Sequence, residues 1–325
     1  MKITDKIKIQ ISIIRALPKR FRLNGVRNGL RLFFYNSMLV WVEDEKKCKE
    51  LYTQKHRLDY VLIQQIARQI TTTGITPSIQ CEDYKIFVLW WQGEDDMPPI
   101  IHAVINSIKA ATDNEVILIT LDNVRKFIDI PDFIWQKYIC KKMGAAHFSD
   151  YTRMALLEKF GGLWIDSTVL CTKKIPDWIY EQDFFTIKAV EHTTDLLDEK
   201  YVAKGRWNTQ VFGTNKKGHP FFSTVRRLLE QYWREHDYMI DYLLFDDIIL
   251  YAYNTNTFIK KEMDTVPVSN AEMHSLLPLM NSSFNKDCWE RLSANTFMFK
   301  LTYKGEHKEV ENGKATFYHH VINSW

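Results

Sequence analysis

Two short apolar segments separated by a helical one constrain the fold of this chain more than any other feature. Residues 85–93 (KIFVLWWQG) and 115–122 (EVILITLD) have the length and composition of buried strands, and residues 97–112 (MPPIIHAVINSIKAAT) have a helical pattern. A strand, a helix and a strand in this order favour a parallel sheet with a crossover helix. Ligands of open α/β sheets bind at the carboxyl ends of the strands. The aromatic and polar residues expected at those ends are Trp90, Trp91, Gln92 and Asp122.

A helix followed at once by a strand is predicted for residues 147–166 (HFSDYTRMALLEKFGGLWID). We expect Ser149 to cap this helix, with Asp150 in its first turn and the glycine pair as its stop. Asp150 and Arg153 are spaced i and i+3, so they lie on one face of the helix. Asp166 follows the apolar strand. The sequence therefore predicts that three charged side chains converge at one edge of the sheet.

The carboxylate of Asp166 needs either a counter-charge or a turn whose main-chain N–H groups donate hydrogen bonds to it. Burying an unpaired charge costs on the order of several kcal/mol. Mg²⁺ and Mn²⁺ prefer oxygen ligands and keep waters and substrate phosphates in their shell, so one or two carboxylates are enough to bind them. Pairing with Arg153 and capping of a turn are the simpler explanations, and the residue pattern leaves all three open.

Charge and composition exclude several classes of protein. The 325 residues are 46% apolar, which is enough for a sizeable globular core. Lys and Arg total 43 against 40 Asp and Glu, a balance too even to predict nucleic acid as a partner. The five cysteines show no CxxC or Cys/His spacing, which argues against disulfides and structural zinc and favours a reducing cytosol. No run approaches eighteen apolar residues, so we expect neither secretion nor a membrane span.

The first 40 residues are strongly basic. They hold nine Lys and Arg residues against one acidic residue, Asp5, interleaved with Ile, Leu and Phe. One interpretation is an amphipathic surface that rests on anionic lipid headgroups. It would make the protein cytoplasmic and peripheral at the inner face of the cell membrane. The other interpretation is a basic helix that packs on the main domain and is otherwise solvated.

A domain boundary is predicted near residue 80. Residues 41–80 have helical patterns that end at residues 71–78 (TTTGITPS), where Gly74 and Pro77 indicate a linker. The sequence therefore predicts an N-terminal helical, basic extension over residues 1–80 and a main α/β domain over residues 81–325.

Residues 149–166 (SDYTRMALLEKFGGLWID) resemble the SDxxRxxLLxxxGGxYxD signature of the retaining glycosyltransferases of family 32 and of the related capsular polysaccharide synthesis proteins. The likeness extends over residues 87–176. It implies that residues 81–325 form a catalytic domain of the GT-A fold, a Rossmann-like nucleotide-sugar-binding domain with a mainly parallel central sheet. It also implies retaining transfer from a nucleotide-sugar donor, a UDP-sugar, to an oligosaccharide or lipid-linked glycan acceptor of bacterial capsule or surface polysaccharide.

The resemblance assigns donor binding to aromatic residues near the strand ends. It implies that Trp90 or Trp91 stacks on the base of the nucleotide, with Gln92 and Gly93 beside it. Trp164, inside the motif itself, is a further donor-binding candidate. Aromatic rings suit base stacking, although they are equally common in an ordinary core.

The resemblance also assigns roles to the charged residues of the motif. Asp150 and Arg153 would hold ribose and sugar hydroxyls at the catalytic site. Asp166 is similar in position to the first carboxylate of a DxD motif, which reaches the metal ion and the diphosphate. The sequence departs from that motif at Thr168, a hydroxyl where the second carboxylate would stand. Mn²⁺ or Mg²⁺ is the expected cofactor, and with one carboxylate it needs another ligand, binds weakly, or is replaced by Lys and Arg.

The C-terminal residues 317–325 (FYHHVINSW) resemble the His-containing end of family 32 enzymes, which folds over the diphosphate. The resemblance makes His320 a candidate metal ligand and Ser324 and Trp325 candidate donor-binding residues. Adjacent histidines near a carboxyl terminus are otherwise solvent-exposed, and a terminal tryptophan often only fills a groove. Both interpretations stay open.

Three polar residues of the second half are further candidates for donor binding. Asn208 could bind sugar hydroxyls from a loop, and Asp246 and Asp247 could orient the sugar or the acceptor. Ordinary loop polarity explains Asn208 equally well. Capping, or pairing with Arg226 or Arg227, explains the two carboxylates.

Two other classes of protein are consistent with these residues. A glycoside hydrolase uses two carboxylates about 5 to 10 Å apart, for which Asp150 and Asp166 could serve, but the tryptophans at the strand ends would then be unexplained. A non-catalytic module that kept the fold and binds a glycan or nucleotide is suggested by the incomplete DxD motif. A transferase slowly hydrolyses its donor without acceptor, and neither alternative does.

Overall fold

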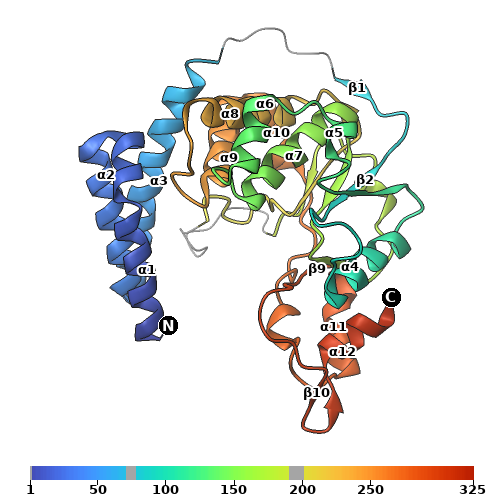
Figure 1. Ribbon diagram of the computed structural model, residues 1–325. Coiled ribbons are helices and arrows are strands. Elements are labelled where there is room, and N and C mark those ends of the chain that lie inside the picture. The colour runs from blue at the N-terminus through green and yellow to red at the C-terminus, as the bar shows by residue number, and fades with distance from the viewer. Residues whose placement is uncertain (1, 71–77, 190–200) are drawn as a thin grey trace.

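The computed structural model describes residues 2–70, 78–189 and 201–325 and shows a mixed α/β protein (Figure 1). Three N-terminal helices stand at one side of a domain that is built around a five-stranded sheet, and elements near the C-terminus lie below that sheet in this view. Residues 71–77 of the predicted linker lie outside the described residues. The predicted boundary at residue 80 stays a prediction.

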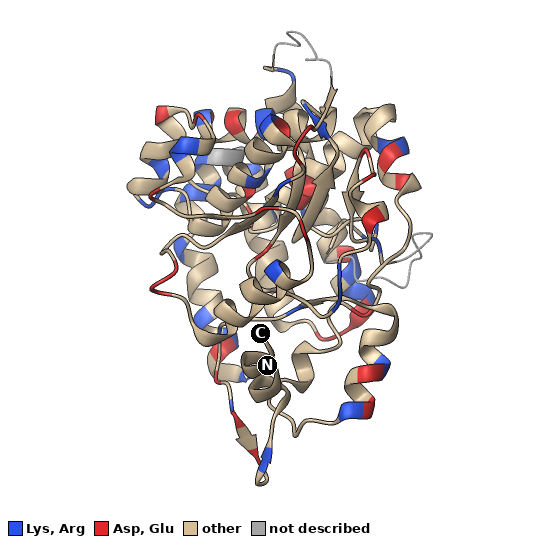
Figure 2. Ribbon diagram, turned by 90° about the vertical axis from the view of Figure 1, so that its right-hand side faces the viewer, with Lys and Arg blue, Asp and Glu red and all other residues tan. Residues whose placement is uncertain are grey.

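The predicted helical extension is present as α1 (Ile3–Arg15), α2 (Leu17–Trp41) and α3 (Glu45–Ala67). Helices α1 and α2 pack on each other, and α3 packs on α2 and on two helices of the main domain. Figure 2 shows acidic and basic residues intermingled over the main domain, so the basic excess of the first 40 residues is local. None of the helices within the described residues is long and apolar enough to cross a membrane.

The central sheet is mixed, so the prediction of a mainly parallel sheet is wrong. Its strands are β2 (Ile86–Leu89), β3 (Val116–Ile119), β4 (Gly162–Ile165), β6 (Phe185–Thr186) and β7 (Val211–Thr214). Their order is β3-β2-β4-β7-β6. Strand β2 pairs parallel with β3, as the strand-helix-strand pattern predicts, and with β4, whereas β7 pairs antiparallel with β4 and β6. Parallel pairing needs a long, usually helical crossover, and the described residues between β4 and β7 form no α-helix.

Smaller sheets and further helices complete the chain. Strand β5 (Val169–Cys171) pairs antiparallel with β9 (Met298–Lys300), which joins the segment after β4 to the C-terminal region. Two more antiparallel pairs are β1 (Ile79–Gln80) with β8 (Lys216–Lys217), and β10 (Val310–Glu311) with β11 (Lys314–Ala315). The helices of the main domain are α4 (Pro99–Ala110), α5 (Val124–Phe127), α6 (Asp132–Ile139), α7 (Ala145–Phe160), α8 (Pro220–Glu235), α9 (Leu244–Thr255), α10 (Thr257–Thr265), α11 (Lys286–Asn295), α12 (Phe317–Ser324) and the 3₁₀ turns η1 (Asp177–Ile179) and η2 (Leu277–Leu279).

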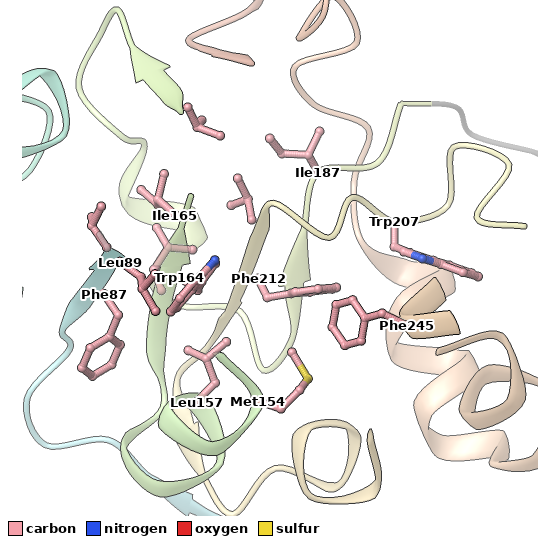
Figure 3. Packing of buried hydrophobic residues seen from close by; sticks show 14 of the residues in the cluster. Phe87, Leu89, Met154, Leu157, Trp164, Ile165, Ile187, Trp207, Phe212 and Phe245 are labelled. Atoms are coloured by element: carbon pink, nitrogen blue, oxygen red, sulfur yellow. The ribbon is translucent and has the colours of Figure 1, made fainter. Parts of the chain in front are cut away.

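The middle strands of the sheet are buried along their whole length. Every residue of β2, β4 and β7 is buried, which is typical of strands covered on both faces. Figure 3 shows Met154 and Leu157 of α7 beside Trp164 of β4, with Phe212 of β7 and Phe245 of α9 next to them. Side chains in such a core sit in fixed positions because they are closely packed. The residues that follow these strands are therefore held on a rigid base.

The glycine pair between α7 and β4 is required by the close approach of two other segments. Gly161 and Gly162 have φ values of +68° and +91°, which L side chains rarely adopt. A Cβ at Gly161 would lie 2.1 Å from Sγ of Cys81, and a Cβ at Gly162 would lie 2.2 Å from the carbonyl oxygen of Lys85. The pair therefore lets the chain turn from α7 directly into the buried strand that ends before Asp166.

Helix α7 begins earlier than the sequence predicts. It spans Ala145–Phe160 and follows Gly144, so Ser149 lies inside the helix and does not cap it. The Ser149 hydroxyl accepts a hydrogen bond from Nη2 of Arg153 at 3.3 Å. Asp150 and Arg153 keep the predicted i, i+3 relation on one helical face.

Candidate functional site

A cavity of about 910 Å³ lies at the carboxyl ends of β2 and β4. Residues that follow both strands, the N-terminal half of α7 and the start of α9 form part of its wall. The structure thus brings most of the predicted side chains together at the strand ends, and what they bind stays a prediction. The predicted site residues in the wall are Trp90, Trp91, Gln92, Asp150, Arg153, Trp164, Asp166, Thr168, Asn208 and Asp246.

Arg153 stands at the centre of the charged residues in this cavity. Its Nη2 atom lies 3.3 Å from Oδ1 of Asp150 and 3.5 Å from Oδ1 of Asp166. The guanidinium also lies over two rings, 5.0 Å from the centre of Trp164 and 5.6 Å from that of Phe245. The predicted convergence of the three charged groups is confirmed, because α7 and the end of β4 lie side by side.

Lys300 is a charged residue of the site that sequence reasoning missed. Its Nζ atom lies 3.2 Å from Oδ2 of Asp166 and donates a hydrogen bond to the hydroxyl of Thr168. The register of β5 and β9 sets Lys300 opposite Val169, so the side chain reaches the residues that precede β5. Lys300 and Asp166 are 134 positions apart in the sequence. No local sequence pattern indicates that a residue so far along the chain contacts Asp166.

Protein cations supply the counter-charge of Asp166. Burial on its own would raise the pKa of this carboxyl, but Arg153 and Lys300 hold the pKa below its usual value. A hydrogen bond of 2.9 Å from the indole N–H of Trp164 to Oδ1 acts in the same direction. Of the three explanations that the sequence left open, pairing with a protein cation is the one that this geometry supports.

The same contacts decide how well a divalent ion fits this position. Lys300 contacts Oδ2 of Asp166 and the hydroxyl of Thr168, the two groups that stand where a DxD motif has its carboxylates. Within the described residues, the one cluster of acidic and histidine side chains close enough to hold a metal ion lies on α3 and α9 and does not include Asp166. One carboxylate can hold Mn²⁺ or Mg²⁺ together with waters and substrate phosphates only where its oxygens are free, and both oxygens of Asp166 already contact Arg153, Lys300 or the indole N–H of Trp164. The residues around Asp166 therefore do not fit such an ion, and the predicted cofactor stays a prediction that this geometry does not support.

Several buried polar atoms of the cavity wall lack a hydrogen-bond partner within the described protein. Buried polar groups of folded proteins are nearly always hydrogen-bonded to protein or water. The unpartnered atoms belong to residues of the cavity wall and have almost no exposed surface of their own. They are Nε1 of Trp90, Nδ1 of His147, Nε of Arg153, Oε1 of Gln210 and Nδ2 of Asn270.

The two tryptophans after β2 are held by neighbouring rings. Trp91 stacks on Phe148 with 4.7 Å between ring centres and 14° between planes. Trp90 meets Tyr303 edge to face at 5.1 Å and is 8% exposed. Gly93 has a φ of +87° and is not part of the cavity wall, so it is a turn residue outside the predicted site. Stacking of a base on either tryptophan stays a prediction.

The adjacent carboxylates of α9 face different surroundings, because consecutive helical residues point about 100° apart. Asp246 lines the cavity and accepts a hydrogen bond of 2.9 Å from the indole of Trp207. Burial raises the pKa of Asp246 to about 7, against the effect of that hydrogen bond and with help from Asp247 and Asp150. Asp247 is bonded to Nδ1 of His56 at 2.9 Å and is not in the cavity wall. The structure therefore does not support the predicted donor-binding role of Asp247.

Asn208 lines the cavity, but the loop around it also uses its side chain. Oδ1 accepts a hydrogen bond of 2.8 Å from the main-chain N–H of Gln210, and Nδ2 lies 3.4 Å from Sδ of Met273. These contacts hold the loop that carries Gln210, whose side-chain oxygen Oε1 has no hydrogen-bond partner within the described residues. Asn208 thus lies next to another residue of the cavity wall, and its own sugar contact stays a prediction.

The C-terminal segment does not reach the cavity, so the structure does not support its predicted roles in metal and donor binding. His320 stacks on Phe284 at 4.0 Å and meets Trp289 edge to face at 4.8 Å. The ring of Trp325 lies 6.4 Å from that of Trp289, and the hydroxyl of Ser324 donates to the carbonyl of His320. None of His320, Ser324 and Trp325 is in the cavity wall. Helix α12 packs on α4, and this packing holds the segment away from Asp166.

Comparison with known protein families identifies the family of this chain. The profile of the capsular polysaccharide synthesis proteins matches residues 40–321, and the chain belongs to this family. No curated protein matches the sequence significantly. Among solved structures, the chain is similar to the PaToxG glycosyltransferase, at 12% identity and a TM-score of 0.39 over 75% of this chain and 94% of that one. It is also similar to the WbbM bifunctional glycosyltransferase in its apo structure, at 12% identity and a TM-score of 0.42 over 98% of this chain and 70% of that one. The resemblance to capsular polysaccharide synthesis proteins is confirmed, and the narrower assignment to family 32 stays a prediction.

Proposed function

We propose that this protein is a glycosyltransferase that transfers a sugar from a UDP-sugar to an oligosaccharide or lipid-linked acceptor of capsule or surface polysaccharide. Membership of the capsular polysaccharide synthesis family supports a role in the synthesis of capsule or surface polysaccharide. The observation that carries the proposed activity is the Asp150, Arg153 and Asp166 constellation, set in a cavity of about 910 Å³ at the ends of β2 and β4. Ligand pockets have volumes of about 300–1,000 Å³ and a few placed polar groups.

The cavity offers complementary groups to each part of such a donor. Arg153 and Lys300 are cations that can face the diphosphate, since charge-assisted hydrogen bonds to phosphate are strong. The carboxylate of Asp150 can accept hydrogen bonds from ribose or sugar hydroxyls. The buried Oε1 of Gln210 and Nδ2 of Asn270 have no protein partner and can accept from and donate to further hydroxyls.

The transfer that we propose retains the configuration of the sugar. The bond between the anomeric carbon and the diphosphate oxygen breaks, and its electron pair stays on that oxygen. The acceptor hydroxyl oxygen bonds to the anomeric carbon from the same face and gives its proton to the departing phosphate. Fixed cations that face the developing negative charge lower the barrier. Asp246 lines the cavity and, with a pKa of about 7, can orient a sugar or acceptor hydroxyl.

A donor panel tests the proposal. We expect one UDP-sugar to raise the melting temperature of the protein, and the same compound to be hydrolysed slowly to UDP without acceptor. The measurement is thermal shift and UDP release over a panel of UDP-, GDP-, ADP- and CMP-sugars. Stabilisation without any hydrolysis, with or without glycan acceptors, would favour a binding module. Cleavage of glycans without nucleotide would favour a hydrolase. No response to any nucleotide sugar would contradict the proposal.

We further propose that helices α1 and α2 rest on an anionic membrane surface. Each helix presents a stripe of exposed apolar residues with i, i+4, i+8 spacing, which places each stripe on one helical face. The first 40 residues also carry nine basic residues against one acidic residue, a charge that is complementary to anionic lipid. The stripes are Ile3, Ile7 and Ile11 on α1 and Val26, Leu30 and Phe34 on α2, which are 44–67% exposed.

The double variant Ile7→Glu/Ile11→Glu should bind anionic vesicles at least tenfold more weakly than the wild type, because it places two carboxylates in the apolar stripe. Co-sedimentation with vesicles of phosphatidylglycerol and phosphatidylethanolamine measures this binding. Ile139→Glu is the matched control, since Ile139 is 49% exposed on α6 of the main domain. Wild-type protein that stays in solution with these vesicles at low salt would contradict the membrane proposal.

A further inference from the structure

The ammonium of Lys300 stands where the resemblance to DxD enzymes expects a divalent ion. Nζ lies 3.2 Å from Oδ2 of Asp166 and bonds the hydroxyl of Thr168. A lysine ammonium has three donors and needs no further ligands from the protein. With two donors directed at Asp166 and Thr168, the third can be directed at a phosphate oxygen in the cavity.

The backbone fixes this lysine in place. Val169 and Lys300 are paired residues of the β5 and β9 ladder. The main-chain N–H of Leu301 donates to the carbonyl of Thr168 at 2.7 Å, which locks the register beside the site. The Lys300 side chain is 21% exposed and lies in the cavity wall. It is therefore both positioned by the sheet and accessible to a ligand.

The surrounding charges favour an ammonium over a divalent ion. A metal ion on Oδ2 of Asp166 would have to displace Lys300 and would stand near Arg153, whose Nη2 is 3.5 Å from the other oxygen of the carboxylate. Like charges at such separations repel strongly in a partly buried site. Lys304 adds another cation to the same wall. These lysines and Arg153 together offer a diphosphate the positive charge that a metal ion would otherwise supply.

We propose that Lys300 takes the place of the metal ion, so that binding and departure of the donor's diphosphate need no divalent cation. This inference rests on the proposed function, because the diphosphate belongs to the proposed donor. As the bond from the anomeric carbon to the phosphate oxygen breaks, the electron pair remains on that oxygen. The ammonium of Lys300 stabilises this negative charge and keeps its own proton. The acceptor hydroxyl forms the new bond, and its proton goes to the departing phosphate.

Calorimetric titration in EDTA tests the inference with UDP and uridine as probes. Wild-type protein should bind UDP equally well in EDTA and in Mn²⁺. Lys300→Gln should bind UDP at least tenfold more weakly and bind uridine with unchanged affinity, because only UDP carries the diphosphate. Lys300→Arg keeps a cation and should retain most of the UDP affinity. Lys286→Gln, at an exposed lysine of α11, is the matched control and should behave as the wild type.

The outcomes separate the inference from the proposed function. UDP binding or UDP release that needs Mn²⁺ or Mg²⁺ and is lost in EDTA would overturn the role of Lys300 and leave the transferase proposal standing. Equal weakening of UDP and uridine by Lys300→Gln would also overturn it, because the lysine would then only support the fold. No binding of UDP, GDP or ADP under any condition would overturn the proposed function and this inference together.

Discussion

Replacing Asp166 with asparagine should lower kcat/KM for sugar transfer by about 10³-fold, the upper end of the effect of removing one charge-stabilising group from an active site. Asparagine has nearly the same shape and can still accept the hydrogen bond from the indole of Trp164. It removes the negative charge that holds Arg153 and Lys300 in the cavity. In the proposed mechanism the two cations act on charge that develops as the donor diphosphate departs, so most of the loss should be in kcat.

An exposed carboxylate supplies the control for this substitution. Asp132 is 92% exposed and lies 3.7 Å from Arg125, so Asp132→Asn should leave transfer unchanged. Steady-state kinetics with the active donor, together with the melting temperature of each variant, makes the comparison. Full activity of Asp166→Asn would contradict the assignment of the site. A large fall in melting temperature with unchanged kcat in the remaining folded protein would show a structural role only.

The local part of the site could be predicted from the sequence because its residues are close along the chain. Asp150, Arg153 and Asp166 lie on one helix and the strand that follows it, and the glycine pair fixes the turn between them. Helical spacing and the end of an apolar run were enough to predict that these groups lie close together. The parallel pairing of β2 and β3 through the α4 crossover was also predictable, because strand, helix and strand follow one another directly in the sequence.

The remainder of the site depends on tertiary pairing that no local pattern encodes. Lys300 reaches Asp166 only through the β5 and β9 ladder. Asp247 turns away from the cavity because α3, from a segment far earlier in the chain, presents His56 to it. His320 is far from the cavity because α12 finds an apolar partner in α4. The sheet is mixed because β7 runs antiparallel to β4, and the composition of β7 does not reveal this direction.

The contact between α3 and the main domain contains buried charges as well as apolar packing. Nζ of Lys55 lies 2.5 Å from Oδ2 of Asp241, with 6% and 10% of the two side chains exposed. His56 is bonded to Asp247 at 2.9 Å. Asp59 is fully buried and both its carboxyl oxygens lack a hydrogen-bond partner within the described residues. Burial raises the pKa of Asp59 well above its usual value, and the nearby Asp241 and Asp247 add to this effect.

This arrangement makes Lys55 the counter-charge on which the contact depends. Lys55→Met should lower the free energy of unfolding by about 3–5 kcal/mol, because Asp241 would stay buried without its partner. Lys49→Met removes an exposed pair with Glu45 from the same helix and should cost only about 0–1 kcal/mol. Urea unfolding at neutral pH measures both. The double variant Lys55→Met/Asp241→Leu should recover most of the lost free energy of unfolding, since it removes the uncompensated charge. Equally small losses for Lys55→Met and Lys49→Met would show that the buried pair does not hold α3 to the main domain.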